Sequence, residues 1–301
     1  MSVASVQFSL NGQTYSLTYD STNSCWKGTL TAPSSTSWNA NTDHKYHGTV
    51  IATDDAGNST TVDINDFSAL GLRVLEKVKP SQSITNPTTG AYITNSKPTI
   101  TWTVTDTGSG VDSSTISIKI DSGSAVTSGI TKTAITNGYS CSYTPGSALS
   151  EGSHTIKINA SDNDGNAATE ATATFTVDTV PPTLTVSTPT DNSITNQATC
   201  TVSGTTNDAT SSPVTISVRV NSGSAVTPTV SGNGSWSTDV TLTSGSNTIT
   251  IVATDSAGKT TTITRTVTLD TGAPVITAVT LTPNPVDAGA TYVITVTATD
   301  D

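Results

Sequence analysis

Apolar residues alternate with polar ones along many short stretches of the chain, and Thr or Ser fills most of the polar positions. Clear examples are residues 100–104, 155–158 and 248–251. In a strand, successive side chains point to opposite faces, so this pattern predicts sheets with one buried face and one hydroxylated face. Clusters of Asp, Asn and Gly separate the stretches and predict tight turns. The sequence therefore predicts an all-β fold.

Three related segments recur along the chain and indicate an internal repeat. A hairpin sequence containing Asp and a following Gly occurs at 51–58, 159–166 and 252–259. A second shared block lies upstream of each copy, at 8–12, 118–126 and 218–226, and opening strands precede it at 93–104 and 194–202. The spacing is close to the length of one small domain, which predicts a row of similar modules.

The junctions at 177–182 and 269–274 carry Asp-Thr followed by Pro, which ends strand pairing and stiffens the joint. Module boundaries are predicted from these junctions. The expected modules are 1–80, lacking its first two strands and including a junction, 81–179, 180–271, and 272–301, which holds only the opening two strands of a further module.

This series of strand, Asp-Thr-x-x-Pro, Val-Asn, Gly-Ser-Trp and Ala-Thr-Asp-x-Ala-Gly motifs resembles bacterial immunoglobulin-like repeats over nearly the whole chain. The resemblance implies tandem immunoglobulin-like β-sandwiches in an extended array, with incomplete modules at both ends. Such modules occur in surface adhesins, in linkers of secreted enzymes and in phage tail or capsid proteins. The resemblance therefore implies an extracellular setting, on a virion or on a bacterial surface, and does not by itself identify the function.

The two incomplete modules complement each other. The first module lacks the two opening strands before residue 8, and two such strands are expected at 273–301. We therefore expect residues 273–301 of one molecule to complete residues 2–69 of the next, giving head-to-tail assembly. The side chains expected at this contact are Phe8, Tyr292, Ile294 and Val296. The alternative is that the sequence boundaries miss the module boundaries and that the tandem array is longer.

The charge and hydrophobicity of the chain limit the kinds of molecule that it is expected to bind. The net charge of −11 arises from 23 acidic and 12 basic residues, without a Lys/Arg cluster that could follow a phosphate backbone, so nucleic-acid binding is not expected. The sequence has no apolar run long enough for membrane insertion, and its first residues do not resemble a signal peptide. We expect export by another route, as in a virus particle, or as part of a longer exported protein.

Cysteines and aromatic residues are interpreted as packing residues. Cys25, Cys141 and Cys200 occur one per module, so we expect small buried residues or free thiols, without the disulfide of antibody domains. Four aromatic residues are expected in the cores at equivalent strand positions, namely Trp26, Trp102, Tyr143 and Trp236.

Acidic residues near module ends are candidate ligands for Ca²⁺, which prefers oxygen donors. The candidates are Asp106, Asp112, Asp162 and Asp164, and the junction residues Asp178 and Asp270 lie in comparable places. An ion there would stiffen the joint between neighbouring modules. The alternative is turn chemistry, since Asp and Asn accept hydrogen bonds from their own backbone in tight turns.

One loop, 35–47, is found only in the first module and is the expected place for specific recognition. Trp38 and Tyr46 in this loop are candidates for stacking on a sugar ring, the alternative being that they pack in the core. The segment 70–79, rich in Leu and basic residues, predicts either an elongated first strand or a docking segment. His44, His47 and His154 are too scattered for a general-base network.

Together these features predict a structural or adhesive repeat protein that is not an enzyme. The first expectation is a phage virion component, associated with the tail or capsid, that spaces or assembles subunits and binds cell-surface glycans. Its partners would be further copies of itself or other virion or surface subunits. The alternatives are a stalk segment of a bacterial adhesin and the linker region of a secreted glycan-degrading enzyme.

Overall fold

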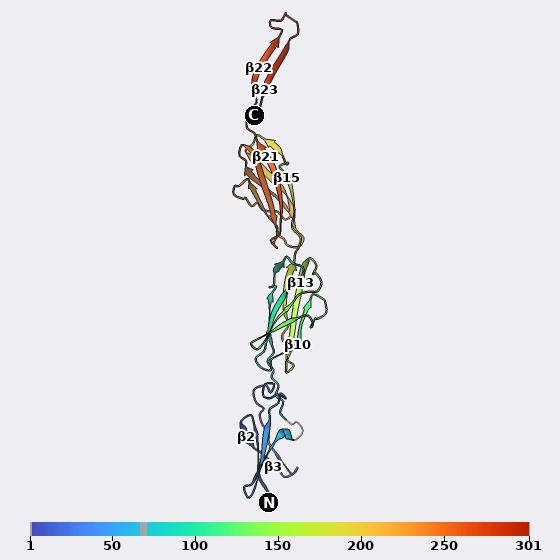
Figure 1. Ribbon diagram of the computed structural model, residues 1–301, viewed down its shortest axis with the longest axis vertical. Helices are drawn as coiled ribbons and strands as arrows, with labels where there is room; N and C mark the ends of the chain where they lie inside the picture. Colours follow the sequence, from blue (N-terminus) through green and yellow to red (C-terminus); the bar gives the residue numbers. More distant parts are fainter. Residues whose placement is uncertain (1, 67–70, 301) are drawn as a thin grey trace. The chain divides into compact units, whose positions relative to one another are not determined.

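The computed structural model describes residues 2–66 and 71–300, and almost every regular element in them is a β-strand (Figure 1). The chain divides into two compact units, Met1–Val177 and Asp178–Asp301. The described helical structure is one short 3₁₀ turn, η1 (Ile64–Asp66). None of the described helices is long and apolar enough to cross a membrane. The expected all-β fold is confirmed.

The first part of the first unit contains two small sheets. One has the order β2-β1-β5-β6, and the other pairs β3 with β4. The strands are β1 (Val3–Leu10), β2 (Gln13–Ser16), β3 (Thr18–Asp20), β4 (Cys25–Lys27), β5 (Gly48–Asp54) and β6 (Ser59–Asp63). Val6 and Leu10 are the buried hydrophobic residues described here, whereas Phe8 is half-buried. This part therefore has a sheet face without a full core.

The rest of the first unit is a closed sandwich with sheets β10-β13-β14-β8 and β11-β12-β9-β7. A cluster of 13 buried residues, including Ile100, Trp102 and Phe175, fills the space between the sheets. The strands are β7 (Ser81–Asn86), β8 (Ala91–Ile93), β9 (Ile100–Thr105), β10 (Val111–Ile120), β11 (Thr131–Ile135), β12 (Gly138–Tyr143), β13 (Gly152–Asp162) and β14 (Ala171–Val177).

The second unit begins with a sandwich of the same kind, with sheets β15-β17-β19 and β16-β21-β20-β18. Its core is also a cluster of 13 buried residues, including Val202, Trp236 and Ile251. The strands are β15 (Thr183–Thr188), β16 (Ser193–Thr195), β17 (Thr199–Asn207), β18 (Thr215–Val220), β19 (Ser235–Thr241), β20 (Gly245–Thr254) and β21 (Thr260–Leu269).

The second unit ends in a hairpin, β22 (Val275–Thr282) with β23 (Val293–Thr299), that is exposed on both faces. Its register starts with Val275 opposite Thr299. The opening strands of the two sandwiches start in the same way, with Ser81 opposite Thr105 and Thr183 opposite Asn207. In all three pairs the partner lies 24 residues further along the chain. The hairpin therefore has the same register as the opening strand pairs of the two sandwiches.

Equivalent turns support the predicted alignment of the repeats. Asn11, Asp121 and Asn221 each follow the strand of the second shared block, and each has a positive φ of 48°, 51° and 51°. Asn and Asp tolerate this left-handed conformation better than other non-glycine residues. The same turn thus occurs in the first, second and third copies.

The core aromatics do not all occupy equivalent positions, contrary to the sequence-based expectation. Trp102 pairs across the sheet with Cys141, whereas Trp236 pairs with Gly204. Gly204 occupies the place of Trp102, because each lies four residues before the Asp that follows its strand. A Cβ at Gly204 would lie 2.9 Å from the Trp236 ring. The large and small members of the pair are therefore exchanged between strands, which keeps the core filled.

The other two aromatics, Trp26 and Tyr143, are only partly buried. The three cysteines are free, as expected. Burial raises the pKa of the Cys141 thiol to about 11, although Lys132 partly opposes the shift. A thiol with such a pKa is almost entirely protonated at neutral pH and is a poor nucleophile.

The segment before β7 does not form the elongated first strand that was one of two interpretations of 70–79. Leu70 lies outside the described residues. From Gly71 to Lys79 the described backbone has a single bridge, between Tyr46 and Leu72. The remainder is an extended junction that brings Glu76 to the end of the following sandwich.

Candidate functional site

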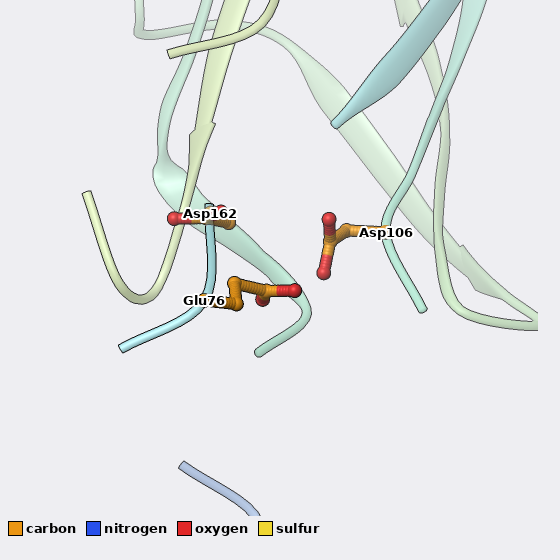
Figure 2. Close-up of side chains that lie close together, drawn as sticks. All are labelled: Glu76, Asp106 and Asp162. Atoms are coloured by element: carbon orange, nitrogen blue, oxygen red, sulfur yellow. The ribbon is translucent and has the colours of Figure 1, made fainter. Parts of the chain in front are cut away.

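Three carboxylates meet at one end of the first closed sandwich. Asp106 directly follows β9, Asp162 ends β13, and Glu76 comes from the junction before β7. One oxygen from each lies within 4.8 Å of the others. Figure 2 shows the Glu76 and Asp106 carboxylates turned toward one another. Asp106 and Asp162 are 5% and 2% exposed, and Glu76 is partly buried.

Local turns fix the two aspartates. The backbone amides of Gly108 and Gly110 each donate to Asp106 Oδ1 at 2.9 Å. Asp162 Oδ1 accepts hydrogen bonds from the amides of Asp164 and Asn166, at 3.0 and 2.7 Å. These bonds are the turn chemistry that was the alternative to a metal site, and they hold Oδ1 of both carboxylates. The side-chain amide of Asn166 also donates to Asp162 Oδ2 at 2.7 Å.

Glu76 is held by contacts with the loop after β9. Its Oε1 accepts a hydrogen bond from the amide of Ser109. A Cβ at position 108 would lie 1.7 Å from Glu76 Oε2, so Gly108 gives the carboxylate the space it occupies. The junction is also attached by its backbone, because the amide of Glu76 donates to Asp164 Oδ2 at 3.1 Å.

Like charges lie close together in this cluster. Two full charges 4.8 Å apart repel by about 3.5 kcal/mol at an effective dielectric constant of about 20. The ion pairs between described residues do not include Glu76, Asp106 or Asp162. Asp106 Oδ2 is buried and has no hydrogen-bond partner. A buried acceptor without a partner is costly to the folded state.

A second cluster lies within the second unit. Asp178, Asp208 and Asp255 are 0%, 8% and 6% exposed, and one oxygen from each lies within 4.8 Å of the others. Asp208 Oδ1 accepts bonds from the amides of Thr210 and Ser211, at 2.8 and 2.7 Å. Asp255 Oδ1 accepts one from the amide of Lys259 at 2.8 Å, while its Oδ2 is buried without a partner. Both clusters thus leave one buried carboxylate oxygen unpaired.

The two clusters occupy the same place in the repeat. In each, a junction acid lies five residues before the first strand, and an Asp follows 30 residues after that acid. Pro stands four residues after the junction acid in both, as Pro80 and Pro182, and Ser stands three residues after the Asp, as Ser109 and Ser211. The third member lies at the end of the strand before the recurring Gly turn: Asp162 is the last residue of β13, and Asp255 directly follows β20. The junction before β22 repeats the first part of this spacing with Asp270, Pro274 and Asp300.

The four predicted metal ligands separate into two groups. Asp106 and Asp162 belong to the first cluster. Asp112 lies elsewhere and accepts hydrogen bonds from the amide and hydroxyl of Ser114, at 2.9 and 2.7 Å. Asp164 has a fully buried side chain that pairs with Arg73 at 2.6 Å and accepts a bond from the Thr36 hydroxyl at 2.5 Å. Asp164 therefore fastens the preceding loop and junction to the sandwich.

Sequence reasoning did not find Glu76, Asp208 or Asp255, although it noted the junction residue Asp178. Glu76 lies among Leu and Lys residues and lacks the Asp-Thr of the other junctions. The Pro four residues later and the Asp 30 residues later are the signals that identify it.

Trp38 and Tyr46 are both half-buried. The ring of Trp38 stacks on His44 with centroids 3.8 Å apart, and the Arg73 guanidinium lies over it at 5.0 Å. The Tyr46 hydroxyl donates to the carbonyls of Ser35 and Thr36 at 3.3 Å. These contacts hold the loop together and leave the Trp38 ring with less free surface for a sugar.

Two closed sandwiches of paired sheets place the chain among tandem immunoglobulin-like β-sandwich proteins. Residues 79–179 match the family described as a bacterial Ig-like domain, and residues 182–271 match glucodextranase, domain B. The predicted resemblance to bacterial immunoglobulin-like repeats is confirmed. No curated protein matches the chain.

Several solved structures are similar to the chain at low sequence identity. The tetra-tandem repeat in the extending region of a large adhesion protein is 22% identical, with 98% of this chain and 79% of that chain covered and a TM-score of 0.34. Fibronectin(III)-like modules of Clostridium thermocellum CbhA are 18% identical, with 63% and 94% covered and a TM-score of 0.37. Domains A168–A170 of titin are 12% identical, with 75% and 73% covered and a TM-score of 0.39.

Proposed function

We propose that the protein is a non-catalytic structural repeat of an extracellular assembly, in which immunoglobulin-like sandwiches space or join subunits. The observation that carries this proposal is the repetition of one sandwich with one junction motif, at Glu76 and Pro80 and again at Asp178 and Pro182. A catalytic site is usually a single constellation, whereas a feature repeated at every junction suits a mechanical or connecting role.

The setting we propose first is a virion, with the module array as a tail- or capsid-associated component. An adhesin stalk and the linker of a secreted glycan-degrading enzyme are the alternatives, and the match of 182–271 to glucodextranase domain B is compatible with the last. The neighbouring sequence distinguishes them. A virion gene lies among structural phage genes, a stalk is flanked by export and wall-anchoring segments, and a linker adjoins a catalytic domain.

Head-to-tail strand complementation is the assembly mechanism we propose, and the exposed hairpin supports it. Ile294 and Val296 occupy the places of Ile100 and Trp102 in the repeat, whose side chains are fully buried. In the hairpin they are 55% and 53% exposed, and Tyr292 is 51% exposed. A row of apolar side chains at positions that are buried in the first closed sandwich is thus uncovered here, and it would gain a core by pairing with another module.

A hollow in the first module also supports this proposal. An opening of about 740 Å³ lies beside β3 and β4, lined by Phe8, Leu17, Trp26 and Leu30 together with Thr18, Lys27, Gly28 and Thr29. In the second module, β12 is followed in its sheet by β9 and β7. The hairpin β22–β23 of another copy supplies the equivalents of those strands. Glycan stacking at Trp38 and Tyr46 stays a prediction, and the stacking of His44 on the Trp38 ring leaves that ring less surface for it.

Light scattering of the purified chain across concentration tests the assembly. We expect masses that grow with concentration for the full chain and a monomer for a chain truncated after Thr271. A variant with Ile294→Asp and Val296→Asp should also be monomeric, because it places charge in the core-facing row. The matched control, Thr295→Asp with Thr297→Asp, changes the other face and should still assemble. Monomers at all concentrations, or equal assembly of all variants, would show that the hairpin does not join copies.

A further inference from the structure

We propose that the outer edge of β19 binds an extended peptide segment of another protein, which adds a strand to the sheet β15-β17-β19 and carries a Lys or Arg opposite Asp239. The inference concerns a single module of one molecule, so it goes beyond the proposed function and is tested without reference to assembly.

The two closed sandwiches differ at this edge. In the sandwich of the first unit, β11 covers β12, from Thr131 opposite Ser142 to Ile135 opposite Gly138. In the sandwich of the second unit, the corresponding sheet has three strands, and the described residues place no strand on the outer side of β19. The edge that β11 closes in one sandwich is therefore open in the other.

The length of the chain explains this difference. Val126 and Val226 are equivalent, because each forms a bridge to the strand of the second shared block. Ser140 and Ser235 are also equivalent, because each lies opposite the Thr that stands three residues before the Asp following the neighbouring strand. The interval between the Val and the Ser is 14 residues in the first unit and nine in the second. The five residues that are missing equal the length of β11.

Backbone groups on the outer side of β19 are free to pair with a strand. The Thr206 amide donates to the Gly234 carbonyl at 2.9 Å, so Gly234 and every second residue after it bond to β17. In an antiparallel pair, alternate residues direct their N–H and C=O groups to opposite sides. Those of Ser237, Asp239 and Thr241 therefore point outward, where the described residues give them no backbone partner. Such a row of donors and acceptors is a template for strand addition.

An opening of about 530 Å³ with a valine-rich lining lies along the same edge. Val226 lines it and is 43% exposed, whereas its equivalent Val126 packs against the core of the other sandwich. Side chains alternate between the two faces of a strand, so an added strand with apolar residues at alternate positions would fill the opening and cover Val226. The lining includes Val218, Val220, Val226, Asp239, Val240 and Thr241.

The charge at this edge favours a basic partner. Asp239 is exposed, its Oδ1 accepts a hydrogen bond from the Thr201 hydroxyl at 2.6 Å, and it belongs to none of the ion pairs between described residues. The residue directly opposite on an added strand would have its Cβ about 4.5–5.5 Å away, close enough for an ion pair. A second copy fits less well, because neither β19 nor the exposed strands β22 and β23 contain Lys or Arg.

Titration of the ¹⁵N-labelled full chain with a synthetic peptide, followed by NMR, tests the proposal. The probe is Thr-Val-Lys-Val-Thr with blocked ends, whose Val side chains face inward when its Lys lies opposite Asp239. The protein carries Ile294→Asp and Val296→Asp, so that the hairpin has lost its apolar row. We expect saturable shifts confined to β18, β19 and the lining of the opening, with slower exchange of the Ser237, Asp239 and Thr241 amides. The absence of saturable shifts at millimolar peptide would overturn the proposal.

Two substitutions of one residue separate backbone pairing from side-chain contact. Ser237→Pro removes an outward N–H that does not bond to β17, and it should weaken peptide binding about tenfold. Ser237→Ala keeps this N–H and should bind the peptide as the unsubstituted edge does. Equal binding by the two variants would show that the peptide does not add a strand.

Charge reversal gives a second test that does not require Ser237→Pro to fold. Asp239→Lys should bind Thr-Val-Glu-Val-Thr more tightly than the Lys peptide, which reverses the preference of the unsubstituted edge. Thr262→Lys, which adds a positive charge at an exposed position of β21, should keep the preference for the Lys peptide. A preference for Lys that survives Asp239→Lys would contradict the assigned partner. So would a dimer in light scattering that Ser237→Pro abolishes, because β19 would then pair with a second copy.

Discussion

The closed sandwiches and the sheets at the two ends of the sequence are made from the same repeat, yet they differ in what covers their apolar faces. Each closed sandwich buries 13 core residues, whereas the described residues before η1 bury the hydrophobic side chains of Val6 and Leu10 alone. The strands of the hairpin β22–β23 are exposed throughout. The alternating pattern is thus sufficient to predict strands. A core forms only where a second sheet, from the same module or from another one, covers the apolar face.

The largest expected difference between these regions concerns core truncation. Trp102→Ala should destabilise its sandwich by about 3–5 kcal/mol, because it removes a fully buried side chain from a closed core. Phe8→Ala should cost about 1 kcal/mol or less in the monomer, since Phe8 is half-buried beside an open hollow. Differential scanning calorimetry resolves the separate transitions. Equal losses for the two variants would mean that the first module has a complete core.

A smaller expected effect, the dependence of stability on pH, distinguishes the two closed sandwiches from each other. His154 is buried, which disfavours its charge, but the Ser150 carbonyl at 2.9 Å and Asp121 at 2.7 Å outweigh burial and raise its pKa. The other sandwich has Asn247 and Asn221 in these places, hydrogen-bonded at 3.2 Å. The folded state therefore binds this proton more tightly than the unfolded state does.

The stability that His154 contributes should be fully present below about pH 6.5, its usual pKa, and should be lost as pH rises through its raised folded pKa. Melting temperatures measured between pH 5 and 9 should fall for the sandwich of 81–177 and change less for that of 183–269. His154→Asn, which copies the neighbouring sandwich, should remove the difference. A pH response that survives this substitution would have to come from another group.

The fold was largely predictable because its signals are local. Alternation at 100–104 and 155–158, and the Asp and Gly turns between strands, specify which residues are strands and which faces are buried. The exchange of Trp102 and Cys141 for Gly204 and Trp236 was not predictable, because it depends on which residues lie opposite each other across two strands. Sequence similarity alone suggested that the aromatic residues occupy one position.

The candidate site was predictable in part, for a related reason. Asp106 and Asp162 stand out beside turn residues, and both belong to a cluster. Asp112 and Asp164 occur in the same sequence context but have other hydrogen-bond partners. Glu76 comes from 30 residues earlier in the chain and completes the cluster only when the junction packs against the sandwich. Long-range convergence of this kind is not visible in the local pattern.

The central claim is that another copy of the chain covers the apolar faces of the end sheets. The most direct test is hydrogen exchange of the full chain at low and at high protein concentration. In dilute solution we expect strong protection of β9, β13, β17 and β20 and weak protection of β1 and β23. At high concentration, protection should rise in β1 and β23 together and remain unchanged in the closed sandwiches. Strong protection of the end sheets already in the dilute monomer, or none at any concentration, would contradict this account.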